Sequence, residues 1–380
     1  MPGGINLPHD ILMEILCRLA VKDLLRLRCV SKSCGDLIDS PDFAKLHLSH
    51  ALTTNSHRFL LLQRIFEPYS LDLDSLEHAQ IKRTDLNSFT DLQVKFPIIG
   101  SCNGLIALET HNGDIVISNP ITRKIRKVPR YSSLPASTED EDVLVNYGFG
   151  YDPVSDDYKL VMLIRLLRHN GINKNQVDSI VSSTKIYSFK VGCWRSCFHE
   201  IPCNLFMRDN AILVNNALHW LIFYPKSSVV GFDLTSERHR DIQLPLLDKY
   251  TYDLMGIVEL GDCLCMIGKK FYDWSGDSVN CDIWVMKEYG LRESWTKLFS
   301  LIFDARMVLL RPLAYSKCGQ KVLFWIDNDM DRNRLVWYDL KGKSTENIEI
   351  SIPDYKGIFV GSLVSPTAAG TNYGPKRKQA

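Results

Sequence analysis

The chain has 380 residues, with 45 Lys and Arg side chains against 44 Asp and Glu, so its formal net charge is only +1. This balance argues against binding to nucleic acid or to an anionic membrane surface, because both need an excess of basic side chains. Apolar residues make up 45% of the chain, enough for a globular core. No apolar run approaches the ~20 residues that cross a bilayer, so membrane insertion is not expected.

The first fifty residues predict four short helices. Apolar residues recur at three- and four-residue steps from Leu7 to Leu19, and Pro8 suits the first turn of such a helix. Further helices are predicted at about 22–29 and 31–39, and Ser40-Pro41-Asp42 predicts the cap and first turn of a fourth. A segment this small has more apolar positions than it can bury by itself, so its surface predicts a protein partner.

This segment resembles an F-box: the similarity runs over "NLPHDILMEILCRLAVKDLLRLRCVSKSCGDLIDSPDF", residues 6–43. The resemblance implies a helical module that docks onto a Skp-type adaptor, which itself sits on a cullin scaffold carrying the ubiquitin-transfer machinery. By position, the resemblance implies these adaptor-facing residues: Leu7, Pro8, Ile11, Ile15, Leu16, Leu19, Val21, Leu24, Val30, Lys32, Ile38 and Phe43.

Two positions depart from the F-box pattern. Ala20 stands where a Pro usually follows Leu19, and Cys34 stands where a Trp is common. Loss of a Trp removes a large contact, so the departures bear on adaptor affinity. Two other interpretations are a generic helical cap on the β region and a helix-turn-helix DNA reader. The second is disfavoured because residues 1–50 hold six basic and six acidic side chains.

After residue 57 short apolar strands bounded by Gly, Pro, Asn, Asp and Ser replace the helical pattern. They form a recurring unit, found at residues 58–77, 101–129, 147–202, 215–245, 261–299 and 321–350. Equivalent points, mostly about fifty residues apart, are Asp72, Asn119, Ser188, Asp233, Met286 and Asp339. Units of this length predict blades of a β-propeller, and six would close a ring. Two packed sheets with irregular loops are the competing architecture.

The β region resembles the plant type of F-box-associated domain, which is kelch-like, over about residues 58–350. The similarity rests on "SCNGLIAL" (101–108), "SNPITRKIRKVP" (118–129), "YGFGYDPVSDDYKLV" (147–161), "ALHW" (217–220), "FDLTSE" (232–237) and "IWVMKEYGLRESWTK" (283–297). The resemblance extends to S-locus F-box proteins and to plant F-box proteins that restrain immune signalling by removing immune receptors. We expect the motif residues to make the fold: Gly104, Gly148 and Gly150 at turns or close approaches, Asp152-Pro153 at a turn, and Trp220, Trp284 and Trp295 in the core.

No set of residues indicates catalysis. The chain lacks a phosphate-binding Gly-x4-Gly-Lys-Ser/Thr motif and a Gly-x-Ser-x-Gly nucleophile elbow. His219 lies in an apolar strand and is expected to be a hydrogen-bonded core residue, and the acidic run at 137–143 is expected to be a solvated loop. We therefore expect no catalytic residue and no cofactor.

Eleven scattered cysteines suit reduced thiols better than a disulfide framework. Cys193, Cys197, His199 and Cys203 could supply four metal ligands, but they lack the Cys-x2-Cys spacing of zinc knuckles, and Cys197 and His199 fall at alternate positions of an apparent strand. Ordinary strand cysteines are the preferred interpretation, so no metal is expected.

The sequence thus predicts an α+β multidomain chain: an F-box at 1–50, a propeller-like substrate-binding domain at 51–365 and a disordered basic tail at 366–380. The tail holds Lys376-Arg377-Lys378, a possible nuclear import signal, and the family resemblance implies cytoplasm and nucleus. The implied function is substrate recognition in a Skp-cullin-F-box ubiquitin ligase, with an immune receptor or another plant protein as target. The alternative is a glycan-binding or hydrolytic propeller with a helical cap.

Overall fold

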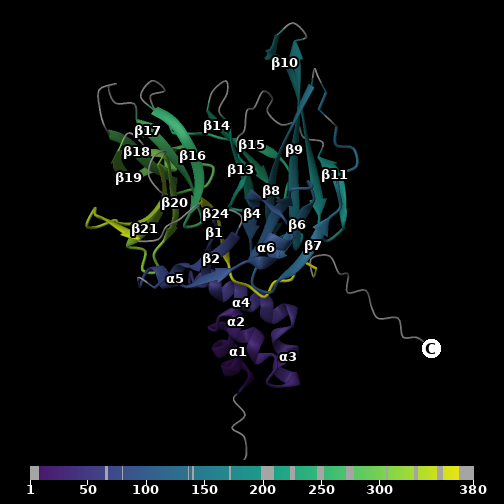
Figure 1. Cartoon of the computed structure of the whole chain (residues 1–380), viewed down its shortest axis with the longest axis vertical. Coiled ribbons are helices and arrows are strands. Elements are labelled where there is room, and N and C mark those ends of the chain that lie inside the picture. Colours follow the sequence, from purple (N-terminus) through teal and green to yellow (C-terminus); the bar gives the residue numbers. More distant parts are fainter. Residues whose placement is uncertain are drawn as a thin grey trace, which may run out of the picture. The chain divides into compact units, whose positions relative to one another are not determined.

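The computed structural model describes residues 8–64, 67–78, 80–135, 137–138, 141–170, 173–197, 209–222, 227–245, 252–270, 278–304, 307–328, 333–348 and 354–367. The chain divides into two compact units, one made of residues 1–97, 101–128 and 356–368 and the other of residues 98–100, 129–355 and 369–380. Figure 1 shows the helices and sheets of the whole chain.

Four helices open the first unit, as predicted: α1 (His9–Cys17), α2 (Val21–Leu27), α3 (Lys32–Ile38) and α4 (Pro41–Thr53). Serine caps set two of the helix starts. The Ser31 hydroxyl accepts a hydrogen bond from the Cys34 N–H at 3.1 Å, and the Ser40 hydroxyl accepts one from the Phe43 N–H at 3.2 Å. These bonds satisfy backbone donors that have no partner within a first helical turn.

One apolar cluster holds the four helices together. Its buried members are Leu16, Cys17, Leu24, Ile38 and Phe43, with one or more from each helix. Burying five such side chains contributes roughly 1.5–3 kcal/mol each, which is large against the 5–15 kcal/mol of a whole small domain. Figure 1 shows the helices together, in purple.

Two four-stranded sheets complete the first unit. In the first, the strand order is β24 (Asp354–Val360), β1 (Arg58–Arg64), β2 (Glu67–Asp72) and β3 (Arg83–Asp85). The second runs β4 (Val94–Cys102), β5 (Leu105–Thr110), β6 (Ile115–Asn119) and β7 (Lys124–Val128). The C-terminal strand therefore completes the sheet that the first β-strand of the chain begins.

Four more sheets form the second unit, each with its strands in chain order. They comprise β8 (Glu141–Asp152), β9 (Asp157–Asn170), β10 (Asn173–Ser188) and β11 (Cys193–Cys197); β12 (Ile212–Val214), β13 (Ala217–Ile222), β14 (Ser228–Asp233) and β15 (His239–Ile242); β16 (Tyr252–Leu260), β17 (Cys263–Lys270), β18 (Ser278–Met286) and β19 (Trp295–Asp304); and β20 (Met307–Tyr315), β21 (Lys321–Asn328), β22 (Arg334–Asp339) and β23 (Thr345–Ile348).

Six separate four-stranded sheets confirm the predicted β-propeller with six blades and exclude the alternative of two packed sheets. The six equivalent points of the sequence repeat also agree with the structure, because each is the last residue of the third strand in its blade. Four of the predicted repeat units, however, begin at the second strand: one misses the three-residue β12 (Ile212–Val214), and the other three miss the longer strands β4, β16 and β20. These strands contain Pro97, Gly256 and Pro312, residue types that interrupt a strand pattern in sequence.

The end of the third strand carries a recurring turn. In the fourth blade, Asp233 Oδ1 accepts hydrogen bonds from the N–H groups of Thr235 and Ser236, and the Asp233 carbonyl accepts from Glu237, which has a positive φ. Asn119 and Asp339 make the same bonds in their blades. A side-chain oxygen at this position thus fixes each turn, which explains why Asp and Asn recur there.

Two short helices after residue 57 were not predicted: α5 (Leu73–Leu76), capped by the Asp72 carboxylate, and α6 (Asn87–Asp91). A 3-10 turn, η1 (Arg292–Ser294), precedes β19. Each is too short to show helical periodicity, so apolar spacing gives no signal for it.

The motif glycines and tryptophans make the fold, as expected. A Cβ on Gly148 would lie 2.7 Å from a Leu218 methyl and 2.8 Å from the Ala211 Cβ, and a Cβ on Gly150 would lie 2.6 Å from a Leu234 methyl. Trp220 and Trp295 are buried and Trp284 is half-buried. The two glycines therefore allow the third blade to pack closely on the fourth.

Candidate functional site

The helical module, residues 8–53, is the first candidate site. Of the twelve residues predicted to face an adaptor, Leu7 lies outside the described residues. The others divide into five that are exposed (Pro8, Ile11, Ile15, Val30 and Lys32), one that is half-buried (Leu19) and five that are buried (Leu16, Val21, Leu24, Ile38 and Phe43). A rigid partner can reach the exposed group, whereas the buried group shapes the surface from within. Adaptor contact stays a prediction for all of them.

Exposed apolar side chains of the helical module lie on α1, on the turn between α2 and α3, and on α4. Ile11 and Ile15 are one helical turn apart on α1 and are 45% and 46% exposed, and Val30 is 71% exposed. Leu46 and Leu52 on α4 are also exposed, and the sequence analysis did not select them. Fully burying a large apolar side chain contributes roughly 1.5–3 kcal/mol, so a partner that covers these partly exposed side chains would gain a fraction of that for each.

The two departures from the F-box pattern lie at different places in the module. Cys34 is half-buried in the first turn of α3, where its N–H is held by Ser31. Ala20 precedes α2 with φ −64° and ψ 146°, angles that a proline also adopts. Its carbonyl accepts hydrogen bonds from the N–H groups of Asp23 and Leu24. Ala20 thus adopts the conformation needed just before α2 without a proline ring to fix its φ.

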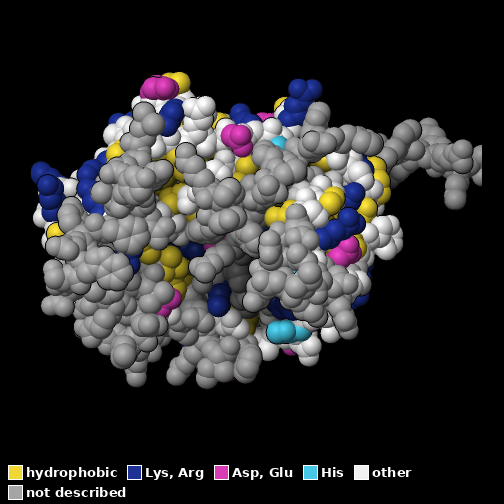
Figure 2. Space-filling view, turned by 90° about the horizontal axis from the view of Figure 1, so that it is seen from above, with side chains coloured by type: hydrophobic (Ala, Val, Ile, Leu, Met, Phe, Trp, Pro, Cys, Tyr) yellow, Lys and Arg dark blue, Asp and Glu magenta, His cyan; other side chains and the backbone are white. Residues whose placement is uncertain are grey.

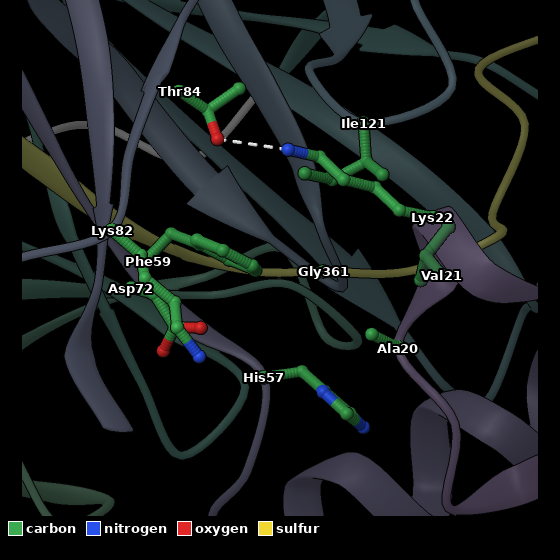
Figure 3. Close-up of a pocket in the computed structure, with 10 residues that line it drawn as sticks. All are labelled: Ala20, Val21, Lys22, His57, Phe59, Asp72, Lys82, Thr84, Ile121 and Gly361. Carbon is green, nitrogen blue, oxygen red and sulfur yellow. Dashed lines mark hydrogen bonds between the residues drawn. The ribbon is translucent and has the colours of Figure 1, made fainter. Parts of the chain in front are cut away.

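A small recess of about 180 Å³ lies at the base of the helices (Figure 3). Its walls come from the start of α2, the first two blades and the chain after β24: Ala20, Val21, Lys22, His57, Phe59, Asp72, Lys82, Thr84, Ile121 and Gly361. Lys22 Nζ donates a hydrogen bond to the Thr84 hydroxyl at 2.8 Å, so a helix and a blade are tied together at its edge. The recess marks the joint between the helical module and the first two blades.

A pair of stacked histidines lies at the same joint. The rings of His47 on α4 and His57 before β1 are 5.6 Å apart and nearly parallel. His47 is fully buried and its Nε2 lies 2.9 Å from the Leu19 carbonyl oxygen. Burial lowers the pKa of His47, and the neighbouring His57 and His50 lower it further, although the Leu19 bond opposes them. The neutral ring is therefore the form that fits this joint.

A buried ionic cluster in the second unit explains the motif "YDPVSDDYKL". Lys159 Nζ donates hydrogen bonds to Asp152 Oδ2 at 2.9 Å, to Glu237 Oε1 at 2.9 Å and to the Leu234 carbonyl at 2.5 Å. Burial alone would raise the pKa of Asp152, but hydrogen bonds from Ser155, Lys159 and Thr235 outweigh it and hold that pKa well below its usual range. The cluster joins the third blade to the fourth, so its role is structural.

His219 is a core residue, as predicted. It is fully buried, with Nδ1 at 3.3 Å from the Ile212 carbonyl and Nε2 at 2.7 Å from the Tyr289 hydroxyl. Arg240 donates to the same hydroxyl at 3.2 Å, which leaves the tyrosine proton free to point at Nε2. The histidine therefore has a partner on each nitrogen and needs no ligand to explain it.

The possible metal ligands can be placed only in part. Cys193 and Cys197 lie on β11, paired with Ser188 and Thr184, whereas His199 and Cys203 lie outside the described residues. Within the described ranges no group of three or more His, Cys, Asp or Glu side chains is arranged to hold a metal ion. Lys376, Arg377 and Lys378 also lie outside the described residues.

On the face shown in Figure 2, basic and acidic side chains of the described residues are interspersed with hydrophobic ones. Among the helices that the structure describes, none is both long and apolar enough to cross a membrane. The mixture of both signs of charge on the face of Figure 2 agrees with the near-zero net charge of the sequence.

Comparison with known proteins matches one family model to the helical part of the chain and another to the β-sheets. A family model described as the F-box domain matches residues 5–46, and one described as the F-box associated beta propeller domain matches residues 57–364. The F-box protein CPR1 of Arabidopsis thaliana is 33% identical over 367 residues, covering 91% of this chain and 84% of that protein. The F-box protein At4g22390 of the same plant is 32% identical over 388 residues, covering 94% of this chain and 90% of that protein.

Proposed function

The chain belongs to the F-box proteins that carry an F-box-associated β-propeller, and from this membership we propose that it is the substrate-recognition subunit of a Skp-cullin-F-box ubiquitin ligase. The helical module binds a Skp-type adaptor, the adaptor joins it to a cullin scaffold, and the propeller binds the protein to be ubiquitinated and degraded. The subunit itself is non-catalytic in this proposal and acts in cytoplasm and nucleus.

The mechanism is tethering. A target bound to the propeller has its lysines held near the ubiquitin carrier, so a bimolecular encounter becomes a local event at a high effective concentration. No reacting group of this chain is needed for that gain. The similarity of its motifs to plant F-box proteins that restrain immune signalling makes an immune receptor the first target class to examine.

The observation that carries the proposal is the exposure of Ile11 and Ile15 on a helix whose other face is already buried in its own core. The test replaces both with Asp. Because each side chain keeps about half its surface in water, covering them contributes on the order of 1 kcal/mol each, and charge in the interface adds to the loss. We expect at least tenfold weaker binding to a purified Skp-type adaptor, measured by calorimetry.

A matched control is Ile302→Asp, which places the same charge at a 72% exposed isoleucine of β19 in the propeller. This variant should bind the adaptor as the wild type does. Equal affinity of the Ile11→Asp/Ile15→Asp variant and the wild type, with the helices still folded by circular dichroism, would refute the assigned surface. No adaptor binding by the wild type would refute the function.

A further inference from the structure

The segment that follows β24, residues 361–366, is buried or half-buried along its length although it forms neither helix nor strand; we call it the C-terminal strap. Gly361, Ser362 and Pro366 are buried, and the Ser362 side chain has no exposed surface. At its start the Gly361 N–H donates a hydrogen bond to the His57 carbonyl at 2.8 Å, beside the recess of Figure 3. Irregular chain usually lies on the surface, so a buried strap needs specific polar partners.

Asn119 supplies two of those partners. Its Nδ2 donates to the Ser362 carbonyl at 2.9 Å and to the Val364 carbonyl at 2.8 Å. Its Oδ1 meanwhile accepts from the N–H groups of Ile121 and Thr122, the turn bonds that the third-strand residue makes in other blades. Asn119 is fully buried, and each of its polar atoms is used.

The amide of Asn119 can donate hydrogen bonds to the strap that the carboxylates at three equivalent positions could not donate. The equivalent residues Asp72, Asp233 and Asp339 close their turns through a carboxylate, which has no proton to donate. Only an amide can cap the turn with its oxygen and hold two carbonyl groups with its nitrogen. Asn119 therefore does more than its counterparts, and the extra bonds all go to the strap.

A second set of contacts holds the strap at the turn between β4 and β5, in the same blade as Asn119. The Ser362 hydroxyl donates to the Asn103 carbonyl at 2.8 Å. Gly104 has a φ of +80°, and a Cβ there would overlap the Ser362 hydroxyl and come within 2.5 Å of the Val360 carbonyl oxygen. The glycine thus lets the strap lie directly on the turn between β4 and β5.

The other side of the strap meets the helices. Leu363 packs against the apolar cluster of the helical module. Between Ser362 and Val364, which Asn119 holds, the chain therefore places a half-buried apolar side chain against the helical core. The helices, His57 before the first blade and Asn119 in the second blade all contact one short segment.

We propose that Asn119 is a positioning residue: through the strap it fixes the orientation of the helical module on the first two blades. The inference rests on the proposed function, since orientation would decide where an adaptor-bound scaffold holds a target relative to the ubiquitin carrier. In physical terms, a rigid joint raises effective concentration more than a flexible one of equal reach.

The test is Asn119→Asp. The carboxylate keeps both turn bonds, as Asp233 and Asp339 do, but cannot donate to Ser362 and Val364 and faces their carbonyl oxygens instead. The matched control is Asp339→Asn, which exchanges the same two residue types at the same position of a blade that lies outside the joint. Spin labels attached through an azide-bearing amino acid at Ser49 and Lys124, both exposed, report the distance between α4 and the second blade.

We expect one narrow distance distribution for the wild-type chain and for Asp339→Asn, and a broad one for Asn119→Asp. Amide hydrogens of residues 361–365 should exchange at least tenfold faster in Asn119→Asp. A narrow distribution with unchanged exchange would overturn the proposal. If Asn119→Asp does not fold, Ser362→Ala, which removes the hydroxyl's bonds to the Asn103 carbonyl and from the Val364 N–H, should give intermediate broadening, and no broadening there counts against the strap.

Adaptor binding is measured on the same samples. We expect Asn119→Asp to bind a Skp-type adaptor as tightly as the wild type, because Ile11 and Ile15 are unchanged. Failure of the wild type to bind the adaptor would overturn the proposed function and leave the distance result valid. A narrow distribution in a variant that binds the adaptor would overturn the strap alone.

Discussion

The Lys159 ammonium lies 2.9 Å from Asp152 Oδ2, and both side chains are almost completely buried. Glu237 shares the same ammonium at 2.9 Å and also pairs with Arg195. Taking two charges out of water costs several kcal/mol per ion, so such a cluster persists only because its members satisfy one another.

Removal of the lysine should therefore be costly. Lys159→Met keeps the length of the side chain but leaves Asp152 buried without its cation, and we expect a loss of about 3–5 kcal/mol in the free energy of unfolding. Urea titration followed by tryptophan fluorescence measures it. The control, Arg18→Met, breaks the exposed Arg18–Glu14 pair and should change stability by less than about 1 kcal/mol. Equal losses in the two variants would contradict the argument.

His219 predicts a pH dependence. Burial lowers its pKa to about 4, against about 6.5 in an unfolded chain. Between these values the unfolded state binds the proton and the folded state does not, so stability is complete above pH 6.5 and falls as the pH drops towards 4. The loss amounts to roughly 3 kcal/mol at pH 4. His219→Gln removes this titrating group, so the unfolding free energy of the variant should fall less than that of the wild type between pH 7 and 4. An equal fall in both proteins would refute the lowered pKa of His219.

Close packing at Gly148 predicts a cost for a single methyl group. In Gly148→Ala the new Cβ would lie 2.8 Å from the Ala211 Cβ. Both atoms are bonded directly to the backbone, so rotation of a side chain cannot relieve the contact. We therefore expect the free energy of unfolding to fall by about 1–3 kcal/mol. Gly256→Ala is the matched control, because a Cβ there meets only the Ile267 methyl at an ordinary 3.8 Å. Denaturant titration should separate the two, and a larger loss in Gly256→Ala would be the contrary result.

Ala20 offers a stabilising change. Its φ of −64° is already that of proline, and its N–H has no acceptor among the residues that the structure describes. Ala20→Pro should raise the unfolding free energy by about 0.4–1 kcal/mol by restricting the unfolded chain. Ala44→Pro, which breaks the bond from the Ala44 N–H to the Ser40 carbonyl, should instead cost about 3 kcal/mol. A lower melting temperature for Ala20→Pro would show that the preceding residue is strained.

Local pattern was sufficient for much of this fold. The helix starts could be predicted because Ser40 and Pro41 act within their own turn, and the blade repeat because Asp233 and Asp339 close turns within four residues. Signals of this kind depend only on neighbours in the chain.

Pairings over long distances in sequence could not be predicted. Nothing near Asn119 indicates that it holds Ser362, and nothing near β1 shows that β24 lies beside it. The predicted adaptor-facing set includes both exposed and buried residues for a different reason. Ile15 and Leu16 are both apolar and adjacent, and only the packing of the other helices shows that one is exposed and the other buried.

The pairing of β24 with β1 also sets the order of events during synthesis. About 290 residues separate the two strands, so the first blade stays one strand short until nearly all of the chain has left the ribosome. The helices need no such delay, apart from the contact with Leu363. If the proposed function holds, a newborn chain would therefore bind its adaptor before its first blade is complete, and a premature stop upstream of β24 would yield a subunit that binds the adaptor while its first blade lacks a strand.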